Sequence, residues 1–277
     1  MTMIVVVLVF SILVLWDRPA VTEVVNEERA SLQFSSTELP LVSAQAWLIF
    51  DLETGTVINS HNKDLVYPIA SVTKLMAAQS TLNSEVLWAT TTVTWSDLNA
   101  DGRSGRLSYG DRYLGHTLLF PMLLESSNDA ATTLSRFDEN LVGRMNQKVE
   151  ELGITDTQFV DASGLSMDNQ SSVESLMKLS TDVFRHDRHL IDISGLDSYL
   201  GKQQAWQNNS PFINFTGYLG GKHGYLPEAG RSATLFFDDN LNGGVNRTLG
   251  YVLLGSEDLV SDVRLLRTYV KETVSWE

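Results

Sequence analysis

Cysteine is absent from the 277-residue chain, which excludes a disulfide scaffold, thiolate metal sites and a cysteine nucleophile. Positive charge is also scarce. The 20 Lys and Arg residues face 34 Asp and Glu residues, which gives a formal net charge of −14. This balance argues against a nucleic-acid partner and against a basic membrane-binding patch. The length and the ordinary composition, 43% hydrophobic and 19% charged, are enough for a sizeable core in one large domain or two small ones.

Long apolar runs are rare, and the clearest one opens the chain. Residues 1–16, "MTMIVVVLVFSILVLW", contain no charged side chain. As a helix they would reach about 24 Å, which is short of a hydrocarbon core but fits a signal-peptide apolar region or a short membrane anchor. A buried strand rich in Val and Ile is the alternative. We expect residues 1–16 to export or anchor the protein, and residues 17–43, with mixed polarity and two prolines, to form a tether.

The rest of the chain reads as strands at both ends with helices between them. Apolar runs and turn residues predict strands over 46–50, 56–60, 215–225, 232–239 and 247–255. Helical spacing predicts helices over 69–82, 114–137 with a break near 126–128, 141–153, 173–185 and 258–274. This order predicts an α+β fold in which the first and last strands form one antiparallel sheet and a helical lobe is inserted. No repeat is visible.

A possible nucleophile and base stand together in "SVTK". On a helix, positions i and i+3 share a face, so the amine of Lys74 can reach the hydroxyl of Ser71. A serine needs such a base, and burial can lower the pKa of a lysine enough to provide it. Backbone N–H groups at the helix start would also steady an oxyanion. The pattern alone is weak because Ser175 and Lys178 repeat it, and a surface lysine is the common explanation.

Two further polar stretches carry candidate site residues. Ser126 could relay a proton at the break between two helices, and the amide of Asn128 could hold a substrate amide, although a helix cap explains the same residues. Lys222, His223 and Gly224 lie on a predicted strand, where a small Gly224 would let a substrate backbone approach. A glycine-rich turn with two polar residues is the plain alternative.

Taken together, these three stretches match the S-x-x-K, S-x-N and K-x-G set, in that order and in fitting contexts. The chain resembles the low-molecular-mass penicillin-binding proteins, the serine D-Ala-D-Ala carboxypeptidases and endopeptidases of bacterial cell-wall metabolism. The resemblance runs from about residue 44 to the last helix. It includes "IFDLETGTVINSHN", "YPIASVTKLMAA", "SSNDAA", "FVDASGL" and "AGRSATLFF".

The resemblance implies a β-lactamase/transpeptidase-like fold over residues 44–277 and an acyl-enzyme mechanism without a metal or an organic cofactor. Ser71 would be the nucleophile, Lys74 the proton acceptor and Ser126 an aid to proton transfer. Asn128, Lys222, His223 and Gly224 would bind substrate. His223 departs from the family pattern, which has Thr or Ser there, so we expect altered substrate choice, a pH-dependent rate or a tolerated substitution.

The implied partners are peptidoglycan peptides that end in D-Ala or are cross-linked through it, with β-lactams as acylating inhibitors. The implied location is the periplasm or cell envelope of a bacterium. A class A-like β-lactamase is disfavoured because "DASGLSMDNQSS" lacks the Glu that would activate water, and Glu174 lacks the right surroundings. A catalytically silent peptidoglycan-binding relative is the other alternative. The short stretch after the predicted domain mildly favours an endopeptidase over a carboxypeptidase.

Overall fold

The computed structural model describes residues 32–34, 39–99, 102, 105–202 and 204–276. The helices are α1 (Thr73–Leu82), α2 (Gly115–Leu124), α3 (Asn128–Phe137), α4 (Leu141–Glu151), α5 (Val173–His186), α6 (Arg188–Ser194) and α7 (Leu259–Thr273), with short 3₁₀ helices η1 (Ala70–Val72), η2 (Glu85–Trp88) and η3 (Asp97–Asn99). The longer strands are β2 (Ala46–Asp51), β3 (Val57–His61), β10 (Tyr218–Leu226), β11 (Gly230–Asn240) and β12 (Asn246–Ser256). The shorter strands are β1 (Leu32–Phe34), β4 (Tyr67–Pro68), β5 (Thr90–Thr92), β6 (Arg112–Leu114), β7 (Gln170–Ser171), β8 (Ser198–Leu200), β9 (Ala205–Gln207) and β13 (Val274–Trp276).

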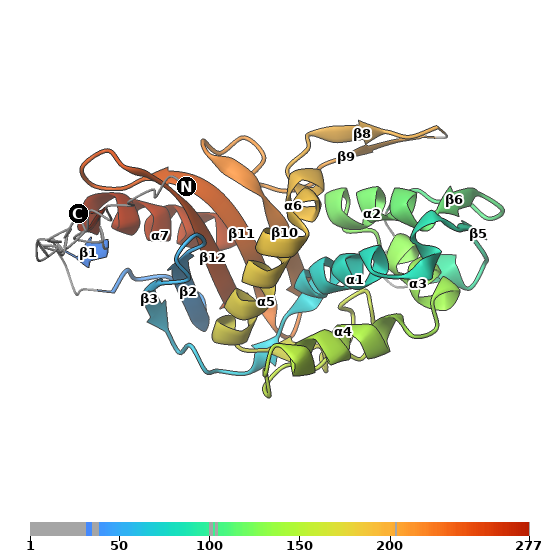
Figure 1. Cartoon of the computed structure of the whole chain (residues 1–277), viewed down its shortest axis with the longest axis horizontal. Coiled ribbons are helices and arrows are strands. Elements are labelled where there is room, and N and C mark those ends of the chain that lie inside the picture. The colour runs from blue at the N-terminus through green and yellow to red at the C-terminus, as the bar shows by residue number, and fades with distance from the viewer. Residues whose placement is uncertain (1–31, 35–38, 100–101, 103–104, 203, 277) are drawn as a thin grey trace, which may run out of the picture. The chain divides into compact units, whose positions relative to one another are not determined.

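The five longer strands form one antiparallel sheet in the order β10-β11-β12-β2-β3 (Figure 1). β12 pairs with β2 from Leu249 opposite Asp51 to Leu254 opposite Ala46. The expected pairing of the first and last predicted strands is therefore confirmed. β2 is buried along its whole length, because it lies inside the sheet with both faces covered, as its continuous apolar run indicates.

The two faces of the sheet carry different cores. Leu235 and Phe237 of β11 pack with α7, whereas Phe236 between them joins the core of the helical lobe. A buried ion pair ties α7 to the sheet: Arg267 donates to Asp239 with Nη2 to Oδ1 at 2.6 Å. Tyr251 Oη also donates to Asp239, at 2.7 Å. The sheet is thus closed by α7 on one side and by the helical lobe on the other.

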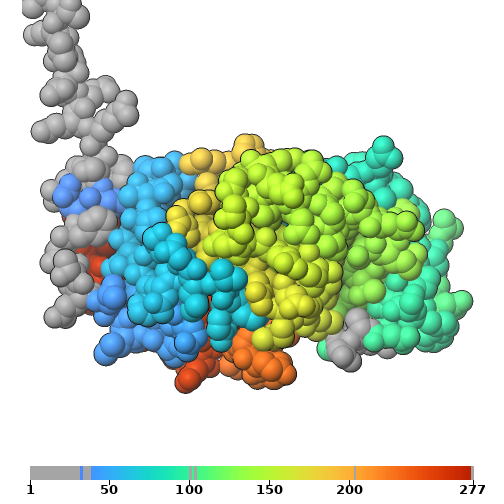
Figure 2. Space-filling model, turned by 90° about the horizontal axis from the view of Figure 1, so that it is seen from below, coloured from blue at the N-terminus to red at the C-terminus, as the bar shows by residue number. Residues whose placement is uncertain are grey.

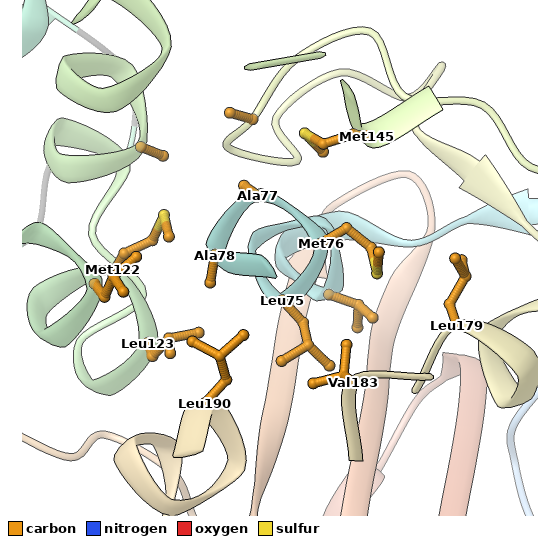
Figure 3. Packing of buried hydrophobic residues seen from close by; sticks show 14 of the residues in the cluster. Leu75, Met76, Ala77, Ala78, Met122, Leu123, Met145, Leu179, Val183 and Leu190 are labelled. Atoms are coloured by element: carbon orange, nitrogen blue, oxygen red, sulfur yellow. The ribbon is translucent and has the colours of Figure 1, made fainter. Parts of the chain in front are cut away.

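Helix α1 is the centre of the helical lobe. Residues 73–81 are all buried, so the helix has neighbours on every side rather than one apolar stripe. Figure 3 shows Leu75 to Ala78 enclosed by other helices, with Met122 and Leu123 of α2 and Leu190 of α6 on one side and Leu179 and Val183 of α5 on another. This packing fixes the start of α1, and with it the preceding turn η1 that contains Ser71, against the sheet.

Several elements were not predicted from the sequence. These are α6, the β8–β9 hairpin, and the two-stranded pairs β1–β13, β4–β7 and β5–β6. The predicted export segment, residues 1–16, lies outside the described residues, as does most of the predicted tether. Of that tether, β1 pairs with β13 near the chain end. Within the described ranges, no helix is both long enough and apolar enough to span a membrane.

Candidate active site

Ser71 lies in the 3₁₀ turn η1, directly before α1. The residue before it, Ala70, has a φ of 50°. Residues other than glycine rarely adopt this left-handed backbone conformation. Ser126 has a φ of 58°. Backbone strain of this kind persists where surrounding contacts enforce it, and it gathers at functional sites. Two of the predicted stretches therefore contain such a residue.

Two glycines in different parts of the chain, Gly224 and Gly164, lie close to the backbone of the turn that contains Ser71. A Cβ on Gly224 of β10 would lie 2.4 Å from the backbone nitrogen of Ser71. A Cβ on Gly164, whose φ is +78°, would lie 2.0 Å from the carbonyl oxygen of Ala70. Side chains at either position would push the turn away. Gly224 was expected to admit a substrate backbone, and the close approach seen here is to the turn of the protein itself.

The amine of Lys74 is the centre of the site. Its Nζ donates to Ser71 Oγ at 2.9 Å, to Asn128 Oδ1 at 2.7 Å and to the carbonyl oxygen of Ser163 at 2.5 Å. The side chain is fully buried. Burial, and then the charge of Lys222, hold the pKa of Lys74 well below its usual value. In the neutral amine, which has two N–H groups, the contact with Ser71 reverses, so that Ser71 Oγ–H donates to Nζ and the amine can accept the proton.

The predicted S-x-N stretch joins α2 to α3. Ser127 caps α3 by accepting a hydrogen bond from the Ala130 N–H at 3.0 Å, so the helix-cap explanation holds for this residue. Asn128 bridges the site, since its Oδ1 accepts from Lys74 and its Nδ2 donates to the Gly102 carbonyl at 3.1 Å. Ser126 lines the same cavity as Ser71. The structure thus brings both stretches together.

Strand β10 carries the K-x-G stretch at the edge of the sheet. Lys222 is buried, its Nζ donates to the His223 carbonyl at 2.5 Å, and burial lowers its pKa to about 7. His223 lines the cavity, where burial and the charge of Lys222 lower its pKa to about 3. Gly221 N–H donates to Ser194 Oγ at 2.8 Å, which holds β10 against α6. Lys222 thus points into the interior, whereas the next three residues, 223–225, line the cavity.

The cavity beside Ser71 has a volume of about 710 Å³. It extends from Ser71 and Ser126 across β10 to the start of α7, where Glu257 and Asp258 lie. Arg231 of β11 lines it too, with Nη1 donating to the Glu257 carbonyl at 3.0 Å. Sequence reasoning quoted the stretch that contains Arg231 but assigned it no role. Its position opposite Tyr225 depends on the β10–β11 register, which only the structure gives.

The loop that supplies the Ser163 carbonyl was also missed. Asp161 organises it by accepting hydrogen bonds from the backbone N–H groups of Ser163, Gly164 and Ser166 and from the Asn169 amide. Burial alone would raise the pKa of Asp161, but these hydrogen bonds lower it below its usual value. The only sequence signal was the turn-forming run "DASG". A backbone carbonyl that accepts a hydrogen bond from a lysine cannot be recognised from the sequence, because every residue has one.

The second S-x-x-K pair is structural. Ser175 donates a short hydrogen bond to Asp156, and Lys178 is exposed. Glu174 forms an ion pair and a hydrogen bond with Lys63, in the loop after β3. In the described part of the chain, no group of three or more His, Asp or Glu side chains is arranged to hold a metal ion.

Comparison with known proteins identifies the family of the chain. The family model described as D-alanyl-D-alanine carboxypeptidase matches residues 33–237. A D-alanyl-D-alanine endopeptidase from Haemophilus influenzae is 31% identical over 224 residues, which cover 77% of this chain and 76% of that protein.

Solved structures share the fold. A D-alanyl-D-alanine carboxypeptidase from Mycobacterium tuberculosis superposes with a TM-score of 0.76 at 24% identity, over 86% of this chain and 94% of that one. Penicillin-binding protein D2 from Listeria monocytogenes, in its cefotaxime-bound form, gives 0.72 at 24% identity, over 84% and 98%. The predicted α+β penicillin-binding fold is confirmed. The chain belongs to the D-alanyl-D-alanine carboxypeptidase family of serine peptidases.

Proposed function

We propose that this protein is a serine D-Ala-D-Ala peptidase that cleaves peptidoglycan stem peptides through an acyl-enzyme on Ser71. The observation that carries the proposal is the buried amine of Lys74, 2.9 Å from Ser71 Oγ and with a lowered pKa. Family membership supplies the substrate class. A nucleophile beside a neutral base is the arrangement that acyl transfer requires.

In the proposed reaction, Ser71 Oγ attacks the carbonyl of the D-Ala residue while its proton passes to Lys74 Nζ. The N–H of Ser71, at the start of α1, stabilises the oxyanion. Ser126 gives its proton to the departing amine as the C–N bond breaks and takes the proton from Lys74, which leaves an ester on Ser71 and a neutral Lys74. A water molecule then attacks the ester and gives up a proton to Lys74, and Lys74 returns a proton to Ser71 Oγ as the peptide acid is released. Each group ends the cycle in its starting form.

Substrate binding is proposed for the groups around this centre. Asn128 would bind the substrate amide, and Gly224 would hold β10 close to Ser71. Lys222 and Arg231 would supply positive charge for a carboxylate next to the cleaved bond. His223, with a pKa of about 3, is neutral near pH 7 and would act as a hydrogen-bonding group of unusual size.

The β-lactamase alternative is not favoured. Its water-activating Glu has no counterpart in the 161–172 loop, and Glu174 is engaged by Lys63. We therefore propose that β-lactams acylate Ser71 and leave slowly, as inhibitors. A silent relative is disfavoured as well, because the Ser71–Lys74 contact is formed. Fast turnover of a β-lactam would overturn this assignment.

Residues 1–16 are proposed to export or anchor the enzyme, since its proposed substrate lies outside the cytoplasmic membrane. The related H. influenzae protein is named an endopeptidase, and we propose that cross-linked peptides are also cleaved here. Fractionation of cells that express the full chain, with and without residues 1–16, tests the first proposal. Recovery of both forms in the cytoplasm would contradict it.

The decisive experiment incubates the purified protein with a defined pentapeptide and with cross-linked muropeptides. Free D-Ala would identify carboxypeptidase activity, and split cross-links would identify endopeptidase activity. Ser71→Ala should abolish both, and Ser175→Ala, from the second S-x-x-K pair, should retain both. Neither product, or equal activity in Ser71→Ala, would refute the proposed function.

A further inference from the structure

Two pairs of stacked rings lie at the two ends of the β5–β6 ladder on the helical lobe. Just before β5, Trp88 stacks on His116, with ring centroids 4.8 Å apart and planes 19° apart. Just after β5, Trp95 stacks on Tyr109 at 4.7 Å and 10°. Figures 1 and 2 show this part of the lobe at the end away from β2 and β3. No role in the proposed reaction involves these rings.

The rings are unusually exposed. Among the described Trp, Tyr and Phe side chains, four expose more than half of their surface: Trp88 at 67%, Trp95 at 64%, Tyr109 at 58% and Tyr225 at 57%. Tyr225 lines the active-site cavity. The other three lie at the two ends of the β5–β6 ladder. Exposing their apolar ring faces to water costs free energy, and a ligand that covers these faces would remove that cost.

A groove of about 370 Å³ lies beside the first ring pair. It is lined by β6, the start of α2 and the β8–β9 hairpin through Thr90, Arg112, Tyr113, Leu114, His116, Thr117, Tyr199, Gly201 and Lys202. Tyr199 is braced from behind by Phe120, with centroids 3.6 Å apart. These lining side chains include two cations and no carboxylate, although the whole chain has a net charge of −14.

Flat rings beside hydroxyl and cationic groups suit a sugar. The C–H face of a pyranose stacks on an aromatic ring, while hydroxyl and acetamido groups hydrogen bond to side chains such as Thr90 and Arg112. The cations also attract the carboxylates of stem peptides. The two ring pairs lie at opposite ends of the β5–β6 ladder, and two separate stacking positions suit a polymer better than a single sugar.

The reach of the substrate connects this surface to Ser71. Helix α2 begins next to His116 and ends two residues before Ser126, which lines the active-site cavity. Ten helical residues span about 15 Å. A stem peptide of four or five residues spans about 13 to 18 Å when extended. A stem peptide that begins beside His116 is therefore long enough to reach the cavity that Ser71 and Ser126 line.

We propose that Trp88, Trp95 and Tyr109, with the groove beside β6, form a binding surface for the glycan strand of peptidoglycan, a polymer of N-acetylated amino sugars. We call it the ring surface. The proposal rests on the proposed function for its choice of ligand. It predicts that the enzyme acts better on polymeric peptidoglycan than on free peptides, because the ring surface holds the strand from which the peptides extend.

The test compares Trp88→Ala/Trp95→Ala with the control Leu41→Ala/Leu265→Ala, which removes two exposed apolar side chains outside the ring surface. Binding is measured by co-sedimentation with glycan from which an amidase has removed the stem peptides, and by tryptophan fluorescence with an N-acetylglucosamine tetramer. Turnover is measured on a soluble pentapeptide and on polymeric peptidoglycan. Labelling of Ser71 by a fluorescent β-lactam and the melting temperature verify that each variant is folded.

We expect the ring variant to lose glycan binding at least tenfold and to slow on the polymer, with pentapeptide turnover within about twofold of the control. The proposal would be overturned if the wild-type protein does not bind peptide-free glycan. It would also be overturned if the ring variant binds this glycan as well as the wild type does. Binding that needs stem peptides would also overturn it, in favour of a peptide site. If wild-type protein binds glycan but cleaves no peptide, the proposed function fails and the ring surface stands.

Discussion

At the residue scale, the site depends on two buried lysines, Lys74 and Lys222. Lys74 contacts the proposed nucleophile, and Lys222 acts on Lys74 through its charge. Burial disfavours the charged form of both amines, which holds the pKa of Lys74 well below its usual value and lowers that of Lys222 to about 7. The sequence motifs predict the identities of these residues, but only the fold supplies the burial that makes them chemically useful.

Replacing Lys222 should move the pH profile of Ser71 acylation. Lys74 must be neutral to accept a proton, so acylation falls as the pH drops through the pKa of Lys74. Lys222→Gln removes a charge that lowers this pKa, which shifts the acidic limb to higher pH. The shift matters most below about pH 7, where Lys222 is charged. We expect the β-lactam acylation rate to fall more on the acidic limb than on the plateau at higher pH, by about tenfold for each unit by which the pKa of Lys74 rises.

The matched control is Lys178→Gln, which removes an exposed lysine from the second S-x-x-K pair. It should leave the profile unchanged. A Lys222→Gln profile that is lower but keeps the same midpoint would show that Lys222 acts on substrate alone.

Arg231 should recognise a carboxylate beside the cleaved bond. Its guanidinium lines the cavity and is held by the Glu257 carbonyl. A charge-assisted hydrogen bond contributes about 1.5–3 kcal/mol, so Arg231→Gln should lower kcat/KM by roughly 10- to 100-fold for a peptide with a free terminal carboxylate. The same peptide with a terminal amide should change little, and Arg231→Lys should retain part of the preference. Equal losses on both peptides would exclude this role.

His223 is proposed to affect substrate choice rather than pH response. A pKa of about 3 keeps it neutral from pH 5 to 8, so the expected pH-dependent rate is not supported for this residue. His223→Thr should change the ratio of pentapeptide to cross-linked muropeptide cleavage several-fold, with the shape of the pH profile kept between pH 5 and 8. An unchanged ratio would mark the histidine as a tolerated substitution.

At the element scale, the sequence predicts the long elements well and the connections poorly. The continuous apolar run of β2 was sufficient to predict a strand, and the helical spacing of α4, α5 and α7 was sufficient to predict helices. Burial determines both patterns. The β8–β9 hairpin and α6 were missed, since a three-residue strand or a seven-residue helix contains too few positions for a period to show. The Ser163 carbonyl was missed because backbone groups have no sequence signature.

Gly224 shows how an element positions the nucleophile. Gly224→Ala should lower the rate of Ser71 acylation by a β-lactam at least tenfold, because a Cβ 2.4 Å from the Ser71 nitrogen displaces β10 or the turn. Gly244→Ala, in the β11–β12 turn, is the control. Its Cβ would meet nothing within 4 Å, so it tests general backbone strain alone. Normal acylation in Gly224→Ala would mean that the two segments tolerate separation.

At the scale of the whole molecule, the site lies where the helical lobe meets the sheet edge, and its buried charge costs stability. The pKa of Lys222 falls from 10.5 to about 7 on folding, so the unfolded chain binds more protons between these values and stability rises with pH across that interval. Below about pH 7 the cost is fully present.

Lys222→Met should therefore stabilise the protein while it impairs acylation. We expect a gain of about 0.5–2 kcal/mol in the free energy of unfolding at pH 7, which shrinks as the pH approaches 10. Urea unfolding at pH 7 and pH 10 measures it, with Lys178→Met as the exposed control. A loss of stability at pH 7 would mean that the amine contributes more through its contacts than its burial costs.

The pairing of β2 with β12 has a consequence for the order in which the protein folds. The two strands lie about 200 residues apart in the chain, with the whole helical lobe between them. β2 can pair with β3 early during synthesis, but it cannot pair with β12 until nearly the entire domain has emerged. Contacts of such long range slow folding, because the loop they close must be ordered first. The central sheet is therefore expected to close late, and until then the apolar run of β2 is open to aggregation or to a chaperone.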